Sequence, residues 1–184
     1  MTSLSEMKMA NLRKRRGSSM DVGIRAIATP LGRMVVVASE EGVCKLEWSE
    51  EPENKSVVGR RHVETAREWV GAFFQKRDAP VPEFDIGNLT MFQRKILGVL
   101  PKVAPFGEVI SYGDLALAAG HENSSRAVGS VMASNPWALL VPCHRVVLRD
   151  GALGNYSGCN GPETKAWLLK HEGRELEHGL RLAR

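Results

Sequence analysis

Cysteine is scarce in this chain, whose 184 residues include only Cys44, Cys143 and Cys159. An odd number of cysteines with no CxxC pair argues against a disulfide framework and against a zinc site made of four thiolates. The simpler interpretation is a reducing intracellular compartment, in which a lone thiol can stay reactive. The scarcity therefore directs attention to the surroundings of each cysteine.

Long apolar runs are also missing. No window of the sequence approaches the unbroken apolar length that a membrane-spanning helix needs, so we expect no association with a membrane. The N-terminus, MTSLSEMKMANLRKRRGSSM, lacks the apolar core of a secretory signal. The apolar fraction of 43% and the charged fraction of 25% are typical of a soluble globular protein. The length suits one domain, or two small ones that share an interface.

Acidic residues are slightly outnumbered, with 21 Asp and Glu against 25 Lys and Arg, so the net charge is +4. This balance favours anionic partners, of which nucleic acid is the obvious one. Part of the excess lies in one basic run: Arg13, Lys14, Arg15 and Arg16. Such a run is most often a solvated tail, and a nuclear address or a nonspecific DNA-binding arm are the alternatives. We assign residues 1–20 to a basic, disordered tail.

A small antiparallel sheet is predicted at the start of the ordered chain. Three β-branched runs are separated by the turn sequences PLG and EEG: residues 22–29, 33–39 and 42–48. Residues 62–76 then place apolar side chains on one helical face. Residues 77–87 contain prolines and acids without periodicity and indicate a linker, with a domain boundary near Asp85. We therefore predict an N-terminal α/β domain over residues 21–84.

The second half of the chain predicts helices. Thr90 can cap a first helix. Two short helices, over residues 111–120 and 125–135, are joined by a polar turn and suggest a helix-turn-helix. Small residues on the second of them suit a close approach to another surface, and close packing inside the protein is the alternative. Pro162 can start a final helix that ends at Gly173. We place a C-terminal domain at residues 85–174 and a tail at 175–184.

The run from Trp137 to Cys143 has no charge and is interpreted as a buried strand that ends in Cys143, His144 and Arg145. A reactive cysteine needs help to lose its proton, and His144 is the nearest base in sequence. Neighbours on a strand point to opposite faces, so a bridging water or a turn at Pro142 is required. A buried structural cysteine is the alternative. Three carboxylates could orient the histidine: Asp150, Glu163 and Glu172.

The run PCHRVV (142–147), with SRAVGSVMASNP upstream and GNYSG and WLLKHEG downstream, resembles the O6-alkylguanine-DNA alkyltransferases. The resemblance covers roughly residues 92–173. It implies an α+β fold: a small antiparallel sheet with helices, RNase H-like, followed by a helical domain with a winged helix-turn-helix. It also implies a repair protein that works once, moving the alkyl group of O6-alkylguanine or O4-alkylthymine onto its own cysteine.

The resemblance assigns the chemistry to five residues. Cys143 is the alkyl acceptor, His144 the water-mediated base, and Glu172 the carboxylate that orients His144. Asn135 is the hinge that holds the helix-turn-helix against the active site. Tyr112 rotates the 3′ phosphate and protonates N3 of the leaving guanine, which would otherwise depart as an anion.

The resemblance assigns further residues to the base and the DNA. Ser157 donates to O6, the carbonyls of Cys143 and Val146 accept the guanine amine, and Tyr156 belongs to the same substrate site. The alkyl carbon is buried in the base stack, so the nucleotide must be flipped out. Arg126 would fill the space that it leaves. The expected DNA contacts are Arg126, Ala127, Gly129 and Ser111, on the minor groove of double-stranded DNA.

Some expectations follow from how this chain departs from its relatives. The loop after Ser157 is about two residues longer than in the human-like pattern, and Cys159 stands where glycine is usual. Trp137 and Ala138 replace valine and proline, which leaves sensitivity to O6-benzylguanine open. Some relatives hold zinc, but only Cys44 and His62 precede the linker here, so no metal is predicted.

The expected protein needs no cofactor and acts as a monomer inside the cell, in the nucleus if the source is eukaryotic and in the cytoplasm if it is prokaryotic. Two other classes of function stay open. The protein could bind damaged DNA or regulate transcription without chemistry. It could also be a cysteine hydrolase, which would need an oxyanion hole and repeated turnover.

Overall fold

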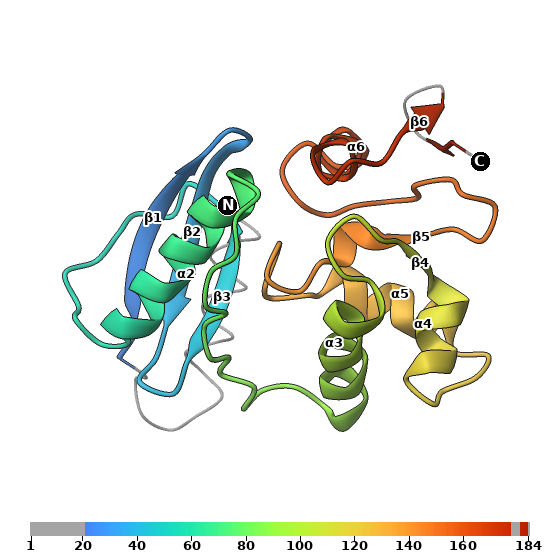
Figure 1. Cartoon of the computed structure of the whole chain (residues 1–184). Helices are drawn as coiled ribbons and strands as arrows, with labels where there is room; N and C mark the ends of the chain where they lie inside the picture. The colour runs from blue at the N-terminus through green and yellow to red at the C-terminus, as the bar shows by residue number, and fades with distance from the viewer. Residues whose placement is uncertain (1–20, 178–180, 184) are drawn as a thin grey trace, which may run out of the picture.

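The computed structural model describes residues 21–177 and 181–183, so the predicted basic tail with its run at 13–16 lies outside the described residues. An antiparallel sheet with one helix lies on one side, and a group of helices lies on the other (Figure 1). The fold is therefore mixed α+β, as predicted. No helix in the described part of the chain combines the length and apolar character that crossing a membrane requires.

The N-terminal sheet has the order β1-β2-β3, and all three strands were predicted. They are antiparallel neighbours: β1 (Gly23–Thr29), β2 (Gly32–Ala38) and β3 (Val43–Trp48). The turn between β1 and β2 needs Gly32, whose φ of 110° favours glycine. Helix α2 (Arg60–Phe74) covers one face and buries the apolar side that its periodicity predicts. It begins two residues before the predicted start.

The C-terminal half contains four α-helices in the described chain: α3 (Met91–Val103), α4 (Tyr112–Ala118), α5 (Ser125–Ala133) and α6 (Pro162–His171). Thr90 and Gln93 form a capping box that starts α3. Ser111 caps α4, and Gly120, with a φ of 70°, ends the turn after it. Gly173 has a φ of 92° just beyond α6. These start and stop signals confirm the predicted helices.

Four short strands were not predicted. Strand β4 (Ile110–Ser111) pairs in parallel with β5 (Val146–Val147), and β6 (Leu176–Glu177) pairs antiparallel with β7 (Arg181–Leu182). The second pair lies in the segment that we assigned to the tail at 175–184, and this boundary stays a prediction. Strands of two residues are too short to show periodicity, which explains why the sequence did not reveal them.

The apolar run before Cys143 is not a strand, contrary to the prediction. Its backbone N–H groups bond within the run, from Leu140 to the Ala138 carbonyl at 2.9 Å and from Val141 to the Trp137 carbonyl at 2.9 Å. Leu139 has a φ of 68°, outside the extended region. Cys143–Arg145 then forms a short 3-10 helix, η1. The run is apolar because it fills the core as a compact turn.

Strand β3 joins the two halves of the chain through its outer edge. Val43 exchanges backbone hydrogen bonds with Glu83 and Asp85, which belong to the predicted linker, at 2.8 and 3.1 Å. The Leu46 N–H donates to the Pro136 carbonyl at 2.8 Å, and the Leu46 carbonyl accepts from the Ala138 N–H at 2.9 Å. The largest apolar cluster contains residues from both halves. The division near Asp85 stays a prediction, because the halves share one core.

Candidate active site

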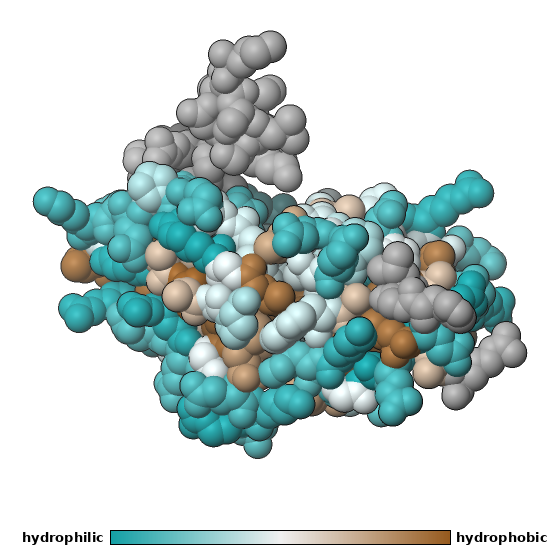
Figure 2. Space-filling view, turned by 90° about the horizontal axis from the view of Figure 1, so that it is seen from above, coloured by the Kyte–Doolittle hydropathy of each residue, from teal (hydrophilic) through white to brown (hydrophobic). Residues whose placement is uncertain are grey.

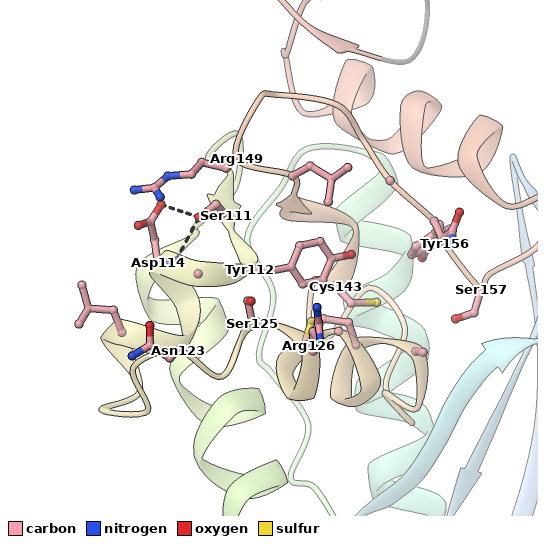
Figure 3. Close-up of a pocket in the computed structure, with 18 of the residues that line it drawn as sticks. Ser111, Tyr112, Asp114, Asn123, Ser125, Arg126, Cys143, Arg149, Tyr156 and Ser157 are labelled. Carbon is pink, nitrogen blue, oxygen red and sulfur yellow. Dashed lines mark hydrogen bonds between the residues drawn. The ribbon is translucent and has the colours of Figure 1, made fainter.

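A pocket of about 1190 Å³ opens between α4, α5 and the segment that follows β5 (Figure 3). The surface of one face of the molecule is mostly hydrophilic, with apolar side chains gathered near its middle (Figure 2). Seven of the predicted site residues line the pocket: Ser111, Tyr112, Arg126, Gly129, Cys143, Tyr156 and Ser157. The structure therefore brings together residues that lie as far as 46 positions apart in the sequence.

The parallel pair β4–β5 places Tyr112 beside Cys143. Ile110 faces Val146, and Ser111 faces Val147. Tyr112 directly follows β4, and η1 with Cys143 directly precedes β5, so the pairing sets both side chains at the same end of the strands. The ring of Tyr112 points toward Cys143 (Figure 3). The register of these short strands thus aligns the predicted proton donor with the predicted acceptor.

His144 and Glu172 lie behind the acceptor, outside the pocket wall. His144 Nε2 is 2.8 Å from Glu172 Oε1, and both side chains are fully buried. The other two candidate carboxylates are elsewhere, since Asp150 pairs with Arg181 and Glu163 is exposed. Of the three predicted alternatives, Glu172 is therefore the carboxylate that orients His144.

The charges in this pair are set by burial and by Arg145. Burial lowers the pKa of His144 and keeps the imidazole neutral, although Glu172 partly opposes this effect. Burial alone would raise the pKa of Glu172, but the hydrogen bonds from His144 and Arg145 and the charge of Arg145 lower it to about 2. A neutral imidazole facing a carboxylate carries its proton on Nε2. Nδ1, which is buried without a partner among the described residues, is then the basic nitrogen.

Arg145 and Lys165 were missed as site residues. Arg145 donates hydrogen bonds from Nε and Nη2 to the Glu172 carboxylate, each at 2.9 Å, and from Nη1 to the Ala104 carbonyl at 2.8 Å. Lys165 is fully buried, and its Nζ donates to the carbonyls of Val146 and Leu153 at 2.5 and 2.6 Å. The sequence contained a signal that Lys165 is buried: Lys165 and Glu172 lie at helical spacing from the buried leucines of α6 and therefore on the same face.

Cys143 is 7% exposed, and burial raises the pKa of its thiol. The side chain of Asn135, the charge of Lys165 and the backbone N–H groups of Cys143 and His144 act in the opposite direction. Burial of Lys165 lowers its own pKa to about 8. The thiol is therefore protonated at rest and needs a base. Burial and the neighbouring Cys143 raise the pKa of Tyr112, so its hydroxyl keeps a proton to donate.

Asn135 ties the end of α5 to the turn before Cys143. Its Nδ2 donates to the Val141 carbonyl at 2.8 Å, and its Oδ1 accepts from the Trp137 backbone N–H at 3.1 Å. Leu139, between these two partners, is buried in a left-handed conformation that costs about 1–3 kcal/mol. The side chain of Asn135 thus links the start and the end of this strained turn.

The exposed side of α5 consists of small residues and Arg126. Arg126, Ala127, Ser130 and Ala133 are exposed, whereas Val128, Val131 and Met132 are buried. Close packing inside the protein, the alternative considered from the sequence, does not account for the exposed small residues. Ser111 accepts from the Asp114 backbone N–H at 3.1 Å and donates to its carboxylate at 2.6 Å. Its role in the structure is that of a helix cap.

The structure bears on two further expectations, one about the carbonyls that would accept the guanine amine and one about a metal site. The Val146 carbonyl, predicted to accept the guanine amine, accepts from Lys165, and the Cys143 carbonyl accepts from the Val146 backbone N–H. Each oxygen has a second lone pair, so both roles stay predictions. Among residues 21–177 and 181–183, no histidine, cysteine and carboxylate side chains gather as a metal site, and Cys44 and His62 do not meet in one.

Residues 91–174 match the family model described as 6-O-methylguanine DNA methyltransferase, DNA binding domain. The chain is 38% identical over 165 residues to the human methylated-DNA–protein-cysteine methyltransferase, covering 80% of this chain and 79% of the human one. The chain belongs to the methylated-DNA–protein-cysteine methyltransferase family. The Shigella flexneri methylated-DNA–protein-cysteine methyltransferase is 34% identical over 168 residues, which cover 80% of this chain and 93% of that protein.

Solved structures of methyltransferases share the fold. The Mycobacterium tuberculosis O6-methylguanine methyltransferase matches with a TM-score of 0.66 and 30% identity, covering 83% of this chain and 93% of that one. A second structure, Mycobacterium tuberculosis OGT in complex with DNA, matches with a TM-score of 0.66 and 31% identity, covering 81% and 91%. The resemblance carried by residues 142–147 and their neighbours is confirmed.

Proposed function

We propose that this protein repairs DNA by direct reversal: it moves the alkyl group of O6-alkylguanine, and of O4-alkylthymine, to Cys143 in a single turnover. Membership of the methyltransferase family supports alkyl transfer as the reaction. The observation that carries the assignment to Cys143 is its position between a buried His144–Glu172 pair and the ring of Tyr112. One thiol thus has a base behind it and a proton donor in front.

The proposed reaction balances as follows. His144 Nδ1, acting through a water molecule, takes the proton of the Cys143 thiol. The thiolate attacks the alkyl carbon, the sulfur–carbon bond forms, and the carbon–O6 bond breaks with its electron pair going to the guanine. Tyr112 gives its hydroxyl proton to N3 of the base and regains one from solvent. The products are guanine and a thioether on Cys143.

The single turnover follows from the product. A thioether has no proton to lose and is not displaced by water under mild conditions, so the thiolate cannot be regenerated. Glu172 serves the first step, because its negative charge stabilises the imidazolium that forms on His144. Arg145 keeps Glu172 ionised through the hydrogen bonds that its Nε and Nη2 donate to the carboxylate. Asn135 acts on the geometry by holding the turn that presents the thiol.

The alkylated base must leave the duplex before it reaches Cys143. We propose that α4, the turn after it and α5 act as a helix-turn-helix whose exposed small residues approach the minor groove of double-stranded DNA. Arg126, at the start of α5 and on the pocket wall, would occupy the space of the flipped nucleotide. Ser111, the N-cap of α4, and Ala127, on α5, lie nearby. Affinity would come mainly from phosphates and fall with salt.

Other finer features of the prediction belong to this proposal. The three-stranded antiparallel sheet with α2 on one face supports an RNase H-like N-terminal part. The β4–β5 pair beside α4 and α5 supports a winged form of the helix-turn-helix. A protein that acts once on one base needs no partner subunit, and we propose a monomer. Its substrate places it inside the cell, in the nucleus of a eukaryote or the cytoplasm of a prokaryote.

The test is the stoichiometry of transfer. The protein is incubated with a duplex that contains radiolabelled O6-methylguanine, in increasing excess, and protein-bound label is counted. We expect label to level off at one methyl per protein, and Cys143→Ser to remain unlabelled. Repeated turnover would indicate a hydrolase, and DNA binding without label would indicate a recognition module. Either result would overturn the proposal.

A further inference from the structure

The loop that carries Tyr156 and Ser157 is held by the N-terminal sheet. Both residues line the pocket, and the loop lies on the side nearest the strands of that sheet (Figure 3). The ring of Trp48, the last residue of β3, meets the ring of Tyr156 edge to face, with centroids 6.3 Å apart at 75°. Trp48 is not among the pocket-lining residues, so it supports Tyr156 from outside the pocket.

The backbone of this loop is pressed against the same two rings. A Cβ atom added at Gly158 would lie 2.7 Å from Tyr156 Cε1 and 2.9 Å from Trp48 Cζ3, closer than real Cβ atoms approach. The next residue, Cys159, donates from its thiol to the Leu31 carbonyl in the turn between β1 and β2, at 3.3 Å. The sheet therefore contacts the loop at two points, and Trp48 leaves no room for a side chain at position 158.

The contact between Trp48 and Tyr156 is one of ring packing. Neither the indole Nε1 of Trp48 nor the hydroxyl of Tyr156 has a hydrogen-bond partner among the described residues, although both atoms are buried. Shape alone thus fixes the Tyr156 ring relative to the sheet. The sheet itself is rigid at this place, because Trp48 pairs with Met34 of β2 and the edge of β3 is bonded to residues 136–138 just before the acceptor turn.

We propose that Trp48 is a positioning residue that sets how large an alkyl group the pocket accepts, by fixing the Tyr156 ring against the space beside Cys143. The inference rests on the proposed transfer to Cys143 and adds a determinant of substrate range from the half of the chain that carries no transfer chemistry. Loss of the Trp48 ring lets Tyr156 tilt away from Cys143, so a bulky O6-substituent gains space. A methyl group, which needs little space, is affected less.

The experiment compares two substituents in one duplex. Rate constants for transfer from O6-benzylguanine and O6-methylguanine are measured under single-turnover conditions, and their ratio cancels differences in DNA binding. We expect Trp48→Ala to raise the benzyl-to-methyl ratio about tenfold. Changes of this size are typical when the size of a hydrophobic pocket decides between two substrates. Trp48→Phe restores an aromatic edge and returns the ratio toward that of the unchanged protein. Trp48→Leu, which keeps apolar volume without a ring, replaces Trp48→Ala if that variant does not fold.

Trp69→Ala is the matched control, since Trp69 lies on α2 and its ring stacks on Phe73 rather than on Tyr156. It should reduce stability and leave the ratio unchanged. A double-mutant cycle adds a second test: with Tyr156→Ala in the background, Trp48→Ala should no longer move the ratio. An unchanged ratio in Trp48→Ala, an equal shift in Trp69→Ala, or a full additional shift without Tyr156 would overturn the inference. Failure of the unchanged protein to transfer methyl would contradict the proposed function instead.

Discussion

The two sides of Cys143 differ in how completely their polar groups are paired. Behind the thiol, Glu172 accepts hydrogen bonds from His144, from Arg145 and from the Gly107 backbone N–H. In front of it, the hydroxyl of Tyr156 has no partner among the described residues, and Arg126 projects from the exposed side of α5. The buried carboxylate behind the thiol is thus fully paired by folding, whereas the Tyr156 hydroxyl in front of it is left unpaired.

This difference has an energetic reason. Buried ionised groups are tolerated only when they are paired, so Glu172 and Arg145 must be bonded to each other for the protein to fold. Arg126, on the pocket side, is exposed and needs no partner in the protein, because water can solvate it. Mutations behind Cys143 should therefore affect stability and chemistry together, and mutations in front should affect chemistry on DNA with little effect on stability.

The largest effect should come from Glu172→Gln, which leaves Arg145 buried with a neutral partner. We expect the free energy of unfolding to fall by about 3–5 kcal/mol and transfer to be lost with it. Urea unfolding at neutral pH measures the change. Glu175→Gln, which alters an exposed carboxylate three residues later, serves as the control and should unfold like the original protein.

The lowered pKa of Glu172 also predicts how the stability of the protein depends on pH. The pKa of Glu172 is lowered from 4.5 to about 2 in the folded protein, so its stabilising contribution is complete above pH 4.5 and is lost as the pH falls toward 2. The difference in stability between the original protein and Glu172→Gln should shrink over that range. A constant difference between pH 6 and 3, measured wherever both proteins remain folded, would show that Glu172 is not held ionised by its neighbours.

Lys165→Met should come next, because it removes the positive charge that lowers the pKa of the Cys143 thiol. We expect benzyl transfer from O6-benzylguanine free base to Cys143 to slow about tenfold, which corresponds to about 1.4 kcal/mol in the barrier. The pKa of Lys165 is lowered to about 8, so the stability of the original protein relative to the variant should rise as the pH increases from 8 to 10.5. A falling difference would contradict the assignment.

Arg126→Ala tests the pocket side. We expect transfer from O6-methylguanine in duplex DNA to slow about tenfold, as for the loss of about 1.4 kcal/mol of binding, while reaction with O6-benzylguanine free base keeps its rate. Arg67→Ala removes the same charge from the exposed side of α2 and should change neither reaction. Equal losses of Arg126→Ala in both assays would show that this arginine does not enter the duplex.

Methylation of Cys143 should have the smallest effect. One added carbon crowds a thiol that is 7% exposed, and overpacking of that kind costs about 1–3 kcal/mol. For a domain of this size, 1 kcal/mol lowers the melting temperature by roughly 2–4 °C. Calorimetry of the protein before and after reaction measures it. An unchanged melting temperature would mean that the acceptor is loosely packed.

Much of this arrangement could be predicted from the sequence. Capping residues and glycines such as Thr90 and Gly120 mark helix ends because they act locally, so the helices were found. The motif around Cys143 identified the family, and with it the pairing of His144 with Glu172. The structure shows that the chain brings these two residues, 28 positions apart in the sequence, into contact.

The rest depends on contacts that leave no local pattern. Strands β4 and β5 have two residues each, and only the tertiary fold pairs them. The apolar run before Cys143 suggested a strand, but the left-handed Leu139 and the ties from Asn135 make it a turn. Trp48 has no motif, because its partner Tyr156 is remote in sequence.

The most direct measurement is the location of the transferred methyl group. After reaction with duplex O6-methylguanine, the protein is digested and its three cysteine-containing peptides are compared by mass spectrometry. The account predicts methyl on Cys143 alone, although Cys159 is the more exposed thiol. Cys44 should stay unmodified, because burial raises the pKa of its thiol to about 11. Methyl on Cys159 or Cys44, or spread among the three, would contradict it.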